Sequence, residues 1–253
     1  MEFLPPLRPT EYAERSLVSL IVGGTYPAGS FLPGERQLAE TLGVTRPTVR
    51  EALQRLSRDG WLQIRQGSKT RVRDYMREGG LRILATLART EAALNPGLVG
   101  RLLELRCSLA PDYVRGAVAA EPAGVLELLG GTAELGEDPD SFAEFDWRLH
   151  RDLARLCENP LYAMTVNDFS EVYALVAPVY FAYPRARRLS RSFYDELRAV
   201  TEAGDDGRAK KASEEAMRRA VVIWKERQAP GAAERRPEKG TGTERFKVPG
   251  EAR

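Results

Sequence analysis

The stretch GVTRPTVREALQRL, residues 43–56, decides the fold of the first part of the chain. Thr45 is a good helix N-cap, because its hydroxyl can accept a hydrogen bond from a backbone N–H that the helix itself leaves unbonded. Pro47 falls in the first turn, where its missing N–H costs nothing. An apolar stripe follows at helical spacing: Val49, Leu53 and Leu56. The stretch therefore predicts a short helix that packs along this stripe.

The other face of this helix is polar and basic. Arg46, Arg50 and Gln54 recur every four residues, so two guanidiniums and an amide point to one side. An arginine fork matches the O6 and N7 acceptors of guanine, and a helix with its donors on one side fits the major groove of DNA. This face predicts a DNA-recognition helix.

The residues on either side complete a winged helix-turn-helix. Glu35–Leu42 has the pattern of a helix that Gly43 ends, because glycine tolerates the left-handed backbone conformation. A helix, a glycine turn and a second helix form the helix-turn-helix arrangement. After Gly60, residues 62–73 alternate apolar and polar side chains about a glycine-containing turn, which predicts a hairpin wing.

The N-terminal residues extend this domain. Thr10 is expected to cap a first helix that Gly23-Gly24 ends. We therefore assign residues 10–74 to a winged-helix domain and residues 1–9 to a flexible arm. Residues 36–77 hold ten Lys or Arg and four Asp or Glu, an excess of positive charge suited to phosphate contact. The alternative is a solvated basic surface, and the wing at the expected distance favours DNA binding.

Composition and targeting signals indicate a cytoplasmic protein. The 253 residues suffice for two modest domains, and the sequence lacks a run of about 18 apolar residues that would predict a membrane span. Residues 1–6 lack the charged and apolar regions of a signal peptide. Cys107 and Cys157 lie in apolar helical patterns and are expected to be reduced core thiols rather than a disulfide.

Beyond residue 74 the patterns are helical. We assign residues 75–90 to a linker helix, interrupted near its start by Gly79-Gly80, and residues 91–228 to an all-α bundle. Residues 229–253 are rich in Pro, Gly and charged residues and lack periodicity, so they are predicted to be disordered. A weak nucleic-acid contact is the alternative role for this tail.

Local signals mark the starts of several bundle helices. Asn95-Pro96 and Asn159-Pro160 are N-cap and first-turn pairs, and Ser141–Glu144 has the pattern of a capping box. The helix that begins at Pro160 is expected to reach Ala182. A proline at position 178 is expected to kink it.

The bundle offers a candidate pocket for a small molecule. Arg106 stands one residue from an apolar stripe, where it either contacts a ligand or forms a salt bridge with a carboxylate such as Asp146. Periodicity does not separate these two readings. Four aromatic residues on the late helices are further candidates, although core packing is the better explanation for any one of them: Tyr173, Tyr180, Phe181 and Trp224.

Metal binding and catalysis are poorly supported. Asp146 and His150 stand four residues apart on one helix face, which could place two ligands on one metal ion. His150 is the only histidine in the chain, so a multi-histidine site cannot be assembled and no metal or cofactor is expected. His150 could act as a base toward Cys107 or Cys157 only by a tertiary accident. We predict that the chain is not an enzyme.

In combination, three of these motifs resemble the winged-helix domain of the GntR family of bacterial transcription regulators: LPGERQLA from residue 32, GVTRPTVREAL from residue 43 and GWL from residue 60. Five further motifs resemble the fatty-acid-metabolism regulators, the FadR type of that family: GGLRILATLAR from residue 79, FAEFD from 142, NPLY from 159, YFAYPRAR from 180 and SFY from 192. The resemblance covers nearly the whole chain apart from the tail. It implies a nucleoid-associated homodimer that binds double-stranded operator DNA and releases it on binding the effector, a long-chain fatty acyl-CoA.

The resemblance also implies which residues contact DNA: Arg36, Thr45, Arg46, Thr48, Arg50 and Gly67. The chain departs from the family pattern at Pro47, which stands in place of a second threonine. It departs again at the wing tip, where Gln66 and Ser68 stand in place of a histidine and a lysine. Lys69 or Arg65 is expected to substitute there.

For the effector, the resemblance implies ligand contacts from Arg106, Tyr180 and Trp224. A glycine and a serine of the family pocket correspond to Met217 and Ala220, which add bulk and remove a hydroxyl. Two alternatives to acyl-CoA regulation follow from these departures. One is a different small-molecule effector, and the other is a constitutive repressor whose bundle only dimerises.

Overall fold

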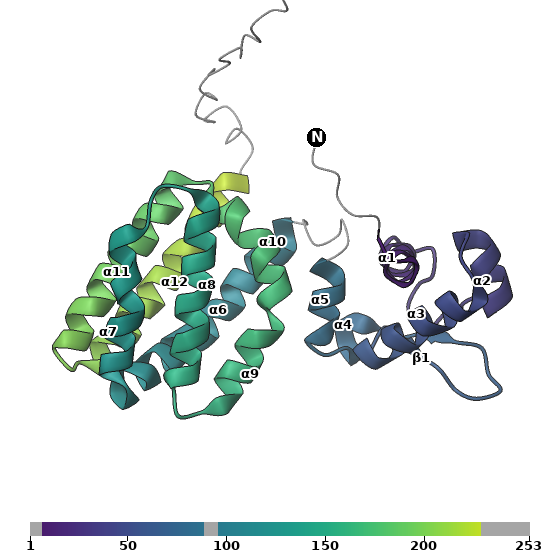
Figure 1. Cartoon of the computed structure of the whole chain (residues 1–253), viewed down its shortest axis with the longest axis horizontal. Helices are drawn as coiled ribbons and strands as arrows, with labels where there is room; N and C mark the ends of the chain where they lie inside the picture. The colour runs from purple at the N-terminus through teal and green to yellow at the C-terminus, as the bar shows by residue number, and fades with distance from the viewer. Residues whose placement is uncertain (1–6, 89–95, 229–253) are drawn as a thin grey trace, which may run out of the picture.

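The computed structural model describes residues 7–88 and 96–228. A small N-terminal domain with a two-stranded hairpin is followed by a larger helical bundle (Figure 1). This arrangement confirms the predicted fold class. Most of the predicted arm, the end of the linker with the Asn95 cap, and the predicted tail lie outside the described residues.

Helices and a hairpin build the N-terminal domain: α1 (Pro9–Val22), α2 (Glu35–Leu42), α3 (Arg46–Asp59), β1 (Leu62–Gln63) and β2 (Arg71–Val72). The two strands are antiparallel, with Leu62 opposite Val72. Trp61 and Leu56 are fully buried in the core between them and the helices. Gly43 ends α2 in the left-handed conformation, as predicted.

α1 begins earlier than predicted. Pro9 lies in the first turn, and the N-cap residue Arg8 makes no side-chain capping bond. Proline suits this place because its φ is fixed near the helical value. The hydroxyl of Thr10, which was expected to cap the helix, instead donates to Oε2 of Glu51 on α3 at 3.1 Å. It therefore joins two helices.

The bundle follows over residues 96–228: α6 (Pro96–Ala120), α7 (Pro122–Gly130), the short 3₁₀ helix η2 (Gly131–Glu134), α8 (Pro139–Leu156), α9 (Pro160–Asp168), α10 (Ser170–Phe181), α11 (Pro184–Glu202) and α12 (Asp206–Gln228). α6 and α11 both pack against α12, while α8 packs against α6, α9 and α10. Phe142, Phe181 and Tyr194 are fully buried among these helices.

Two predicted features of the bundle are wrong in detail. α8 is capped by Asp138, whose Oδ2 accepts both the N–H and the hydroxyl of Ser141 at 2.8 Å, so Ser141 lies inside the first turn. The helix expected over residues 160–182 is divided at Phe169, where α9 ends and α10 begins. The preceding Asn167 and Asp168 are poor helix formers, because their side chains compete for backbone hydrogen bonds.

Two short helices connect the domains, α4 (Tyr75–Glu78) and α5 (Arg82–Ala88), with a break at Gly79-Gly80. Gly79 allows a close approach, because a Cβ there would overlap the side chain of Ile83 and the carbonyl of Tyr75. The predicted linker helix is therefore two helices with a tight glycine junction.

α5 belongs to both domains at once. Ile83 and Leu87 are buried in the core of the N-terminal domain, whereas Leu84 packs against the core of the bundle. The hydroxyl of Thr86 donates to Oδ2 of Asp59, the last residue of α3, at 3.3 Å. On the bundle side α5 packs against α10 (Figure 1). A single helix thus touches the end of the recognition helix and the wall of the bundle.

Cys107 and Cys157 are both unpaired, in agreement with the prediction of reduced thiols. Among the helices of the described ranges, none combines the length and the apolar composition of a membrane span.

Candidate DNA-binding surface and effector cavity

The N-terminus of α3 presents predicted DNA contacts to solvent. Thr45 caps the helix, with its hydroxyl accepting the N–H of Thr48 at 3.4 Å. The two threonine hydroxyls lie 2.8 Å apart, and the side chain of Arg46 beside them is exposed. Unbonded N–H groups and the helix dipole make such an end attractive to an anion, which fits a DNA phosphate.

Arg50 is bound within the protein. Its Nε donates to Oε1 of Glu35 at 3.1 Å, and its Nη2 donates to Oε2 at 2.7 Å. The hydrogen bond from Arg50 lowers the pKa of the Glu35 carboxyl. This pair joins α2 to α3 and fixes the direction of the Arg50 side chain, which is 57% exposed. Arg36 lies 3.9 Å from Glu40 and both side chains are highly exposed, so that contact is weak.

The wing carries the remaining predicted DNA contacts. Gly67 lies at its tip with φ of 72°, a left-handed conformation that favours glycine. Lys69 and Arg65 are exposed. A groove beside the wing is lined by an exposed phenylalanine and by basic and polar side chains: Phe31, Gln63, Arg65, Ser68, Lys69 and Arg71. The wing therefore offers several cations near one apolar ring.

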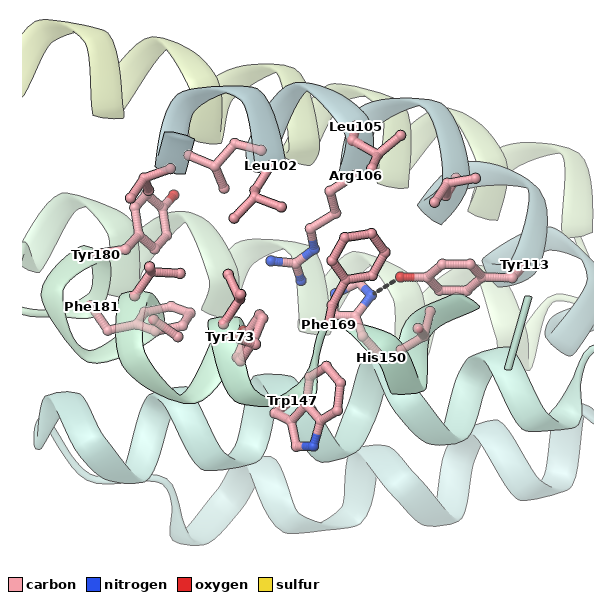
Figure 2. Close-up of a pocket in the computed structure, with 17 residues that line it drawn as sticks. Leu102, Leu105, Arg106, Tyr113, Trp147, His150, Phe169, Tyr173, Tyr180 and Phe181 are labelled. Atoms are coloured by element: carbon pink, nitrogen blue, oxygen red, sulfur yellow. Dashed lines mark hydrogen bonds between the residues drawn. The ribbon is translucent and has the colours of Figure 1, made fainter. Parts of the chain in front are cut away.

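A cavity of about 100 Å³ lies inside the bundle between α6, α8, α9 and α10. Most of its lining is apolar, including Leu102, Leu105 and Phe169. Arg106 projects from α6 into its middle, with Tyr180 toward one end and His150 toward the other (Figure 2). Leu105 is the most exposed of the labelled lining residues at 39%, which places the cavity close to the surface on the α6 side.

Arg106 and Asp146 form the salt bridge that the sequence left as one of two readings. Nη2 of Arg106 lies 2.7 Å from Oδ2 of Asp146, and the carboxylate also accepts the hydroxyls of Tyr173 and Tyr194. Burial raises the pKa of the Asp146 carboxyl, but Arg106, His150 and the two hydroxyls outweigh it and hold that pKa at about 2. The pair is therefore charged, and its carboxylate is saturated with donors.

Two buried polar atoms in the cavity wall lack a hydrogen-bond partner among the described residues, the hydroxyl of Tyr180 and Nε2 of His150. Tyr180 is 6% exposed, and burial raises the pKa of its phenol. Burial, and then the charge of Arg106, lower the pKa of His150 to about 3, so the imidazole is neutral. Because an unsatisfied buried polar group is costly, these atoms mark places where a ligand would gain hydrogen bonds.

The predicted ligand residues divide into two sets. Arg106 and Tyr180 line the cavity. Met217, Ala220 and Trp224 are buried on α12, outside the cavity lining. Trp224 packs beside Gly100 of α6, where a Cβ would lie 3.7 Å from its ring.

Sequence reasoning missed three aromatic residues of the cavity lining, Tyr113, Trp147 and Phe169. Tyr113 lies seven residues after Arg106 on α6, so helical periodicity could have found it. Trp147 follows Asp146 directly, and no pattern in the sequence predicts that its side chain faces the cavity. Phe169 could not be found because it sits at the unpredicted break between α9 and α10.

No cluster of three or more potential metal ligands (His, Cys, Asp or Glu) occurs in the described part of the chain. Nε2 of His150 lies 3.7 Å from Oδ1 of Asp146, but that carboxylate is already bound by Arg106 and two tyrosines. The arrangement is suited to binding a ligand rather than to holding a metal ion.

Residues 9–72 match the family model of bacterial regulatory proteins, gntR family, and residues 73–231 match the FadR C-terminal domain. A fatty acid metabolism regulator protein of Shewanella sp. (strain ANA-3) is 43% identical over 195 residues, which cover 77% of this chain and 81% of the relative. One from Edwardsiella ictaluri is 41% identical over 189 residues, covering 75% and 79%. These relatives are regulators rather than enzymes, in agreement with the sequence-based prediction.

Among solved structures, Lar, which controls the expression of the Listeria monocytogenes agr system, matches with a TM-score of 0.61. The sequence identity is 14%, and the match covers 89% of this chain and 99% of that chain. At this identity the likeness concerns the fold alone.

Proposed function

The chain belongs to the gntR family of bacterial regulatory proteins and carries a FadR C-terminal domain, and on that premise we propose that it regulates fatty-acid metabolism genes through operator binding that long-chain acyl-CoA reverses. The DNA-binding domain reads the operator, and the bundle cavity receives the effector. The observation that carries the proposal is the apolar cavity with Arg106 at its centre and an unsatisfied Tyr180 hydroxyl in its wall.

DNA binding draws on the surface at the start of α3 and on the wing. Arg46 contacts base edges, while Thr45 and Thr48 hold the helix against the phosphate backbone. Gly67 lets the wing tip approach the duplex closely, and Lys69 supplies a cation there. Two copies of the chain, related by two-fold symmetry, read a roughly palindromic operator.

Effector binding draws on the cavity. An acyl chain would pack against the leucine side chains of α6 and against Phe169, and the Tyr180 hydroxyl can donate to the thioester carbonyl. Pockets for small ligands have volumes of about 300 to 1,000 Å³, so a cavity of about 100 Å³ must open for a long chain. Opening past Gly100 would bring the chain to Trp224, with Met217 and Ala220 on the same helix.

The path of coupling runs through α10 and α5. α10 lines the cavity with Tyr173 and Tyr180 and also packs on α5. α5 in turn contacts the end of α3 through Thr86 and Asp59. A ligand that spreads α6 from α10 would therefore displace α5 and change the separation of the two recognition helices. For this to release DNA, the ligand must bind the displaced arrangement more tightly than the described one.

The test is a fluorescence anisotropy titration of a labelled fatty-acid-gene promoter duplex with the full chain, followed by addition of acyl-CoA. We expect binding to the promoter over a scrambled duplex, and loss of the complex with palmitoyl-CoA but not with CoA alone. A complex that survives every chain length would overturn the effector assignment and leave the DNA-binding assignment intact. Equal affinity for promoter and scrambled DNA would overturn the latter.

The small volume of the cavity favours a second candidate, a compact effector rather than an acyl-CoA. Such a molecule would fit around Arg106 and Tyr180 without spreading α6 from α10. Thermal melting of the chain with acyl-CoAs and with short carboxylic acids separates the two. Stabilisation by the short acids alone would favour the compact effector, and stabilisation by neither series would favour a constitutive dimeric repressor.

A further inference from the structure

His150 is a buried polar residue of the cavity wall. The residue is 3% exposed, and the same cavity lining includes Val166 and Phe169. Within residues 7–88 and 96–228, its Nε2 has no hydrogen-bond partner. Oδ1 of Asp146 is 3.7 Å away, beyond hydrogen-bond range. The proposed acyl chain alone would leave this nitrogen unsatisfied.

The imidazole cannot turn to satisfy Nε2 elsewhere. Its Nδ1 lies 2.7 Å from the hydroxyl of Tyr113, and its ring stacks on Phe193 with centroids 6.0 Å apart and planes at 13°. A flip of the ring would exchange Nδ1 with Cδ2 and Nε2 with Cε1, and would leave the Tyr113 hydroxyl facing a C–H. The edge opposite Tyr113 faces the middle of the cavity, where the Arg106 guanidinium lies (Figure 2).

The chemistry of Nε2 defines the group it would accept. The nearby Asp146 carboxylate favours the tautomer with hydrogen on Nε2, in which Tyr113 donates to Nδ1. In that tautomer Nε2 is a donor, and in the other tautomer it is an acceptor. A hydroxyl can satisfy either one, since it both donates and accepts. A methylene satisfies neither.

We propose that His150 selects an effector whose acyl chain carries a hydroxyl group, and that this hydroxyl occupies the place beside Nε2. The inference rests on the proposed function, because it assigns the class of acyl chain that the same cavity takes. It makes His150 a specificity-determining residue. A chain without the hydroxyl would bury the imidazole unsatisfied and bind more weakly.

The test compares acyl-CoAs of equal length in displacing the full chain from its promoter duplex. One has a plain chain, and three carry a hydroxyl next to the thioester, near mid-chain or at the methyl end. We expect one hydroxylated ligand to act at roughly tenfold lower concentration than the plain one, as one buried hydrogen bond predicts. Equal potency of the plain and all hydroxylated chains would overturn the inference, because the imidazole would then be satisfied without the ligand.

A paired variant makes the assignment specific to His150. The double substitution Tyr113→Phe with His150→Phe keeps two rings in place and leaves no orphaned hydroxyl. It should abolish or invert the preference for the hydroxylated chain, whereas His150→Gln, which keeps a donor, should retain part of it. Circular dichroism checks that each variant is folded. A preference unchanged in the double variant would place the selecting group elsewhere and overturn the assignment.

The acyl-CoA effector and the selection of a hydroxylated chain by His150 would be overturned by different results. If no acyl-CoA of either kind displaces the wild-type chain, the effector class itself is wrong and the His150 inference falls with it. If plain and hydroxylated chains displace it equally, the proposed function stands and only the inference is overturned.

Discussion

Nη2 of Arg106 lies 2.7 Å from Oδ2 of Asp146 in the interior of the bundle, and the same carboxylate accepts hydroxyls from Tyr173 and Tyr194. The four residues come from α6, α8, α10 and α11, so this carboxylate joins three helices that line the cavity to α11. A buried pair of this kind does not by itself indicate stability, but losing one partner leaves an uncompensated charge.

We therefore expect Arg106→Leu to destabilise the bundle by about 3 kcal/mol, because Asp146 would stay buried without its cation. The double variant Arg106→Leu with Asp146→Leu should recover part of the loss, since it removes both charges. Urea unfolding of the full chain measures both. The single variant Asp146→Leu completes the comparison. A loss in the double variant equal to the sum of the two single losses would contradict the coupling between the two groups.

The fold of the N-terminal domain could be predicted because its signals are local. The Thr45 cap, the left-handed Gly43 and the apolar stripe of α3 each act within a few residues, and all three are found in the structure. The Thr10 prediction was wrong because a hydroxyl can bond to a distant side chain as well as to its own helix. Sequence alone does not tell which acceptor it finds.

The cavity could be predicted only in part, because its geometry is tertiary. Arg106 was found from its place beside an apolar stripe, but the choice between ligand and salt bridge needed the distance to Asp146. The break at Phe169 follows the weak helix formers Asn167 and Asp168 and has no Pro or Gly signal, so the lining residue there was missed. The role proposed for Trp224 came from family resemblance, and the described cavity does not reach it.

The free energy of unfolding should decrease as the pH falls below 7, because His150 is buried in its neutral form. Burial lowers its folded pKa to about 3 from an ordinary value of 6.5. Between those values the unfolded chain binds a proton there and the folded chain does not, so folding stability falls as pH falls, by at most about 1.4 kcal/mol per unit. Asp146, with its folded pKa of about 2 against 3.8, contributes stability that is lost only below about pH 4.

Because His150 is the only histidine in the chain, it is the side chain whose ordinary pKa falls between pH 5 and pH 7. Unfolding free energies measured from about pH 7 to pH 5 should slope in the wild type and flatten when Tyr113 and His150 are both replaced by Phe. An equal slope in both proteins would mean that another group carries the proton.

Arg46 should carry operator discrimination. Arg46→Ala is expected to lower the preference for the operator over scrambled DNA by about 1–3 kcal/mol, because its guanidinium is exposed and not tied to α2 as Arg50 is. Lys69→Ala is the contrast: it should weaken binding to both duplexes alike and reduce the salt slope by about one. Fluorescence anisotropy at several salt concentrations separates these effects. An unchanged preference in Arg46→Ala would refute its role in base contact.

Gly79→Ala should loosen the junction between α4 and α5. Gly79 has φ of −84°, which any residue adopts, so the cost is the overlap of a Cβ with Ile83 and the Tyr75 carbonyl. We expect a loss of about 1–3 kcal/mol of stability and a weaker response of DNA binding to effector. Gly80→Ala is the matched control, since a Cβ there meets nothing within 4 Å. Equal behaviour of the two variants in melting and in effector titration would remove the junction from the coupling path.

Trp224 tests whether the cavity opens toward α12 when the effector binds. The indole is buried beside Gly100 of α6, outside the described cavity, so it can contact a ligand only if α6 and α12 separate at that glycine. We expect Trp224→Phe to leave operator affinity intact and to raise the acyl-CoA concentration needed for release by roughly tenfold. The truncation Trp224→Ala would cost about 3–5 kcal/mol of stability, so the phenylalanine variant is the cleaner one.

Val222→Ala on the same helix is the control, because Val222 is 52% exposed and faces away from the core. Release at the wild-type concentration in Trp224→Phe would confine the ligand to the space between α6 and α10. A long acyl chain would then have to lie along the exposed Leu105 edge of the cavity, and Leu105→Asp would become the substitution that blocks it.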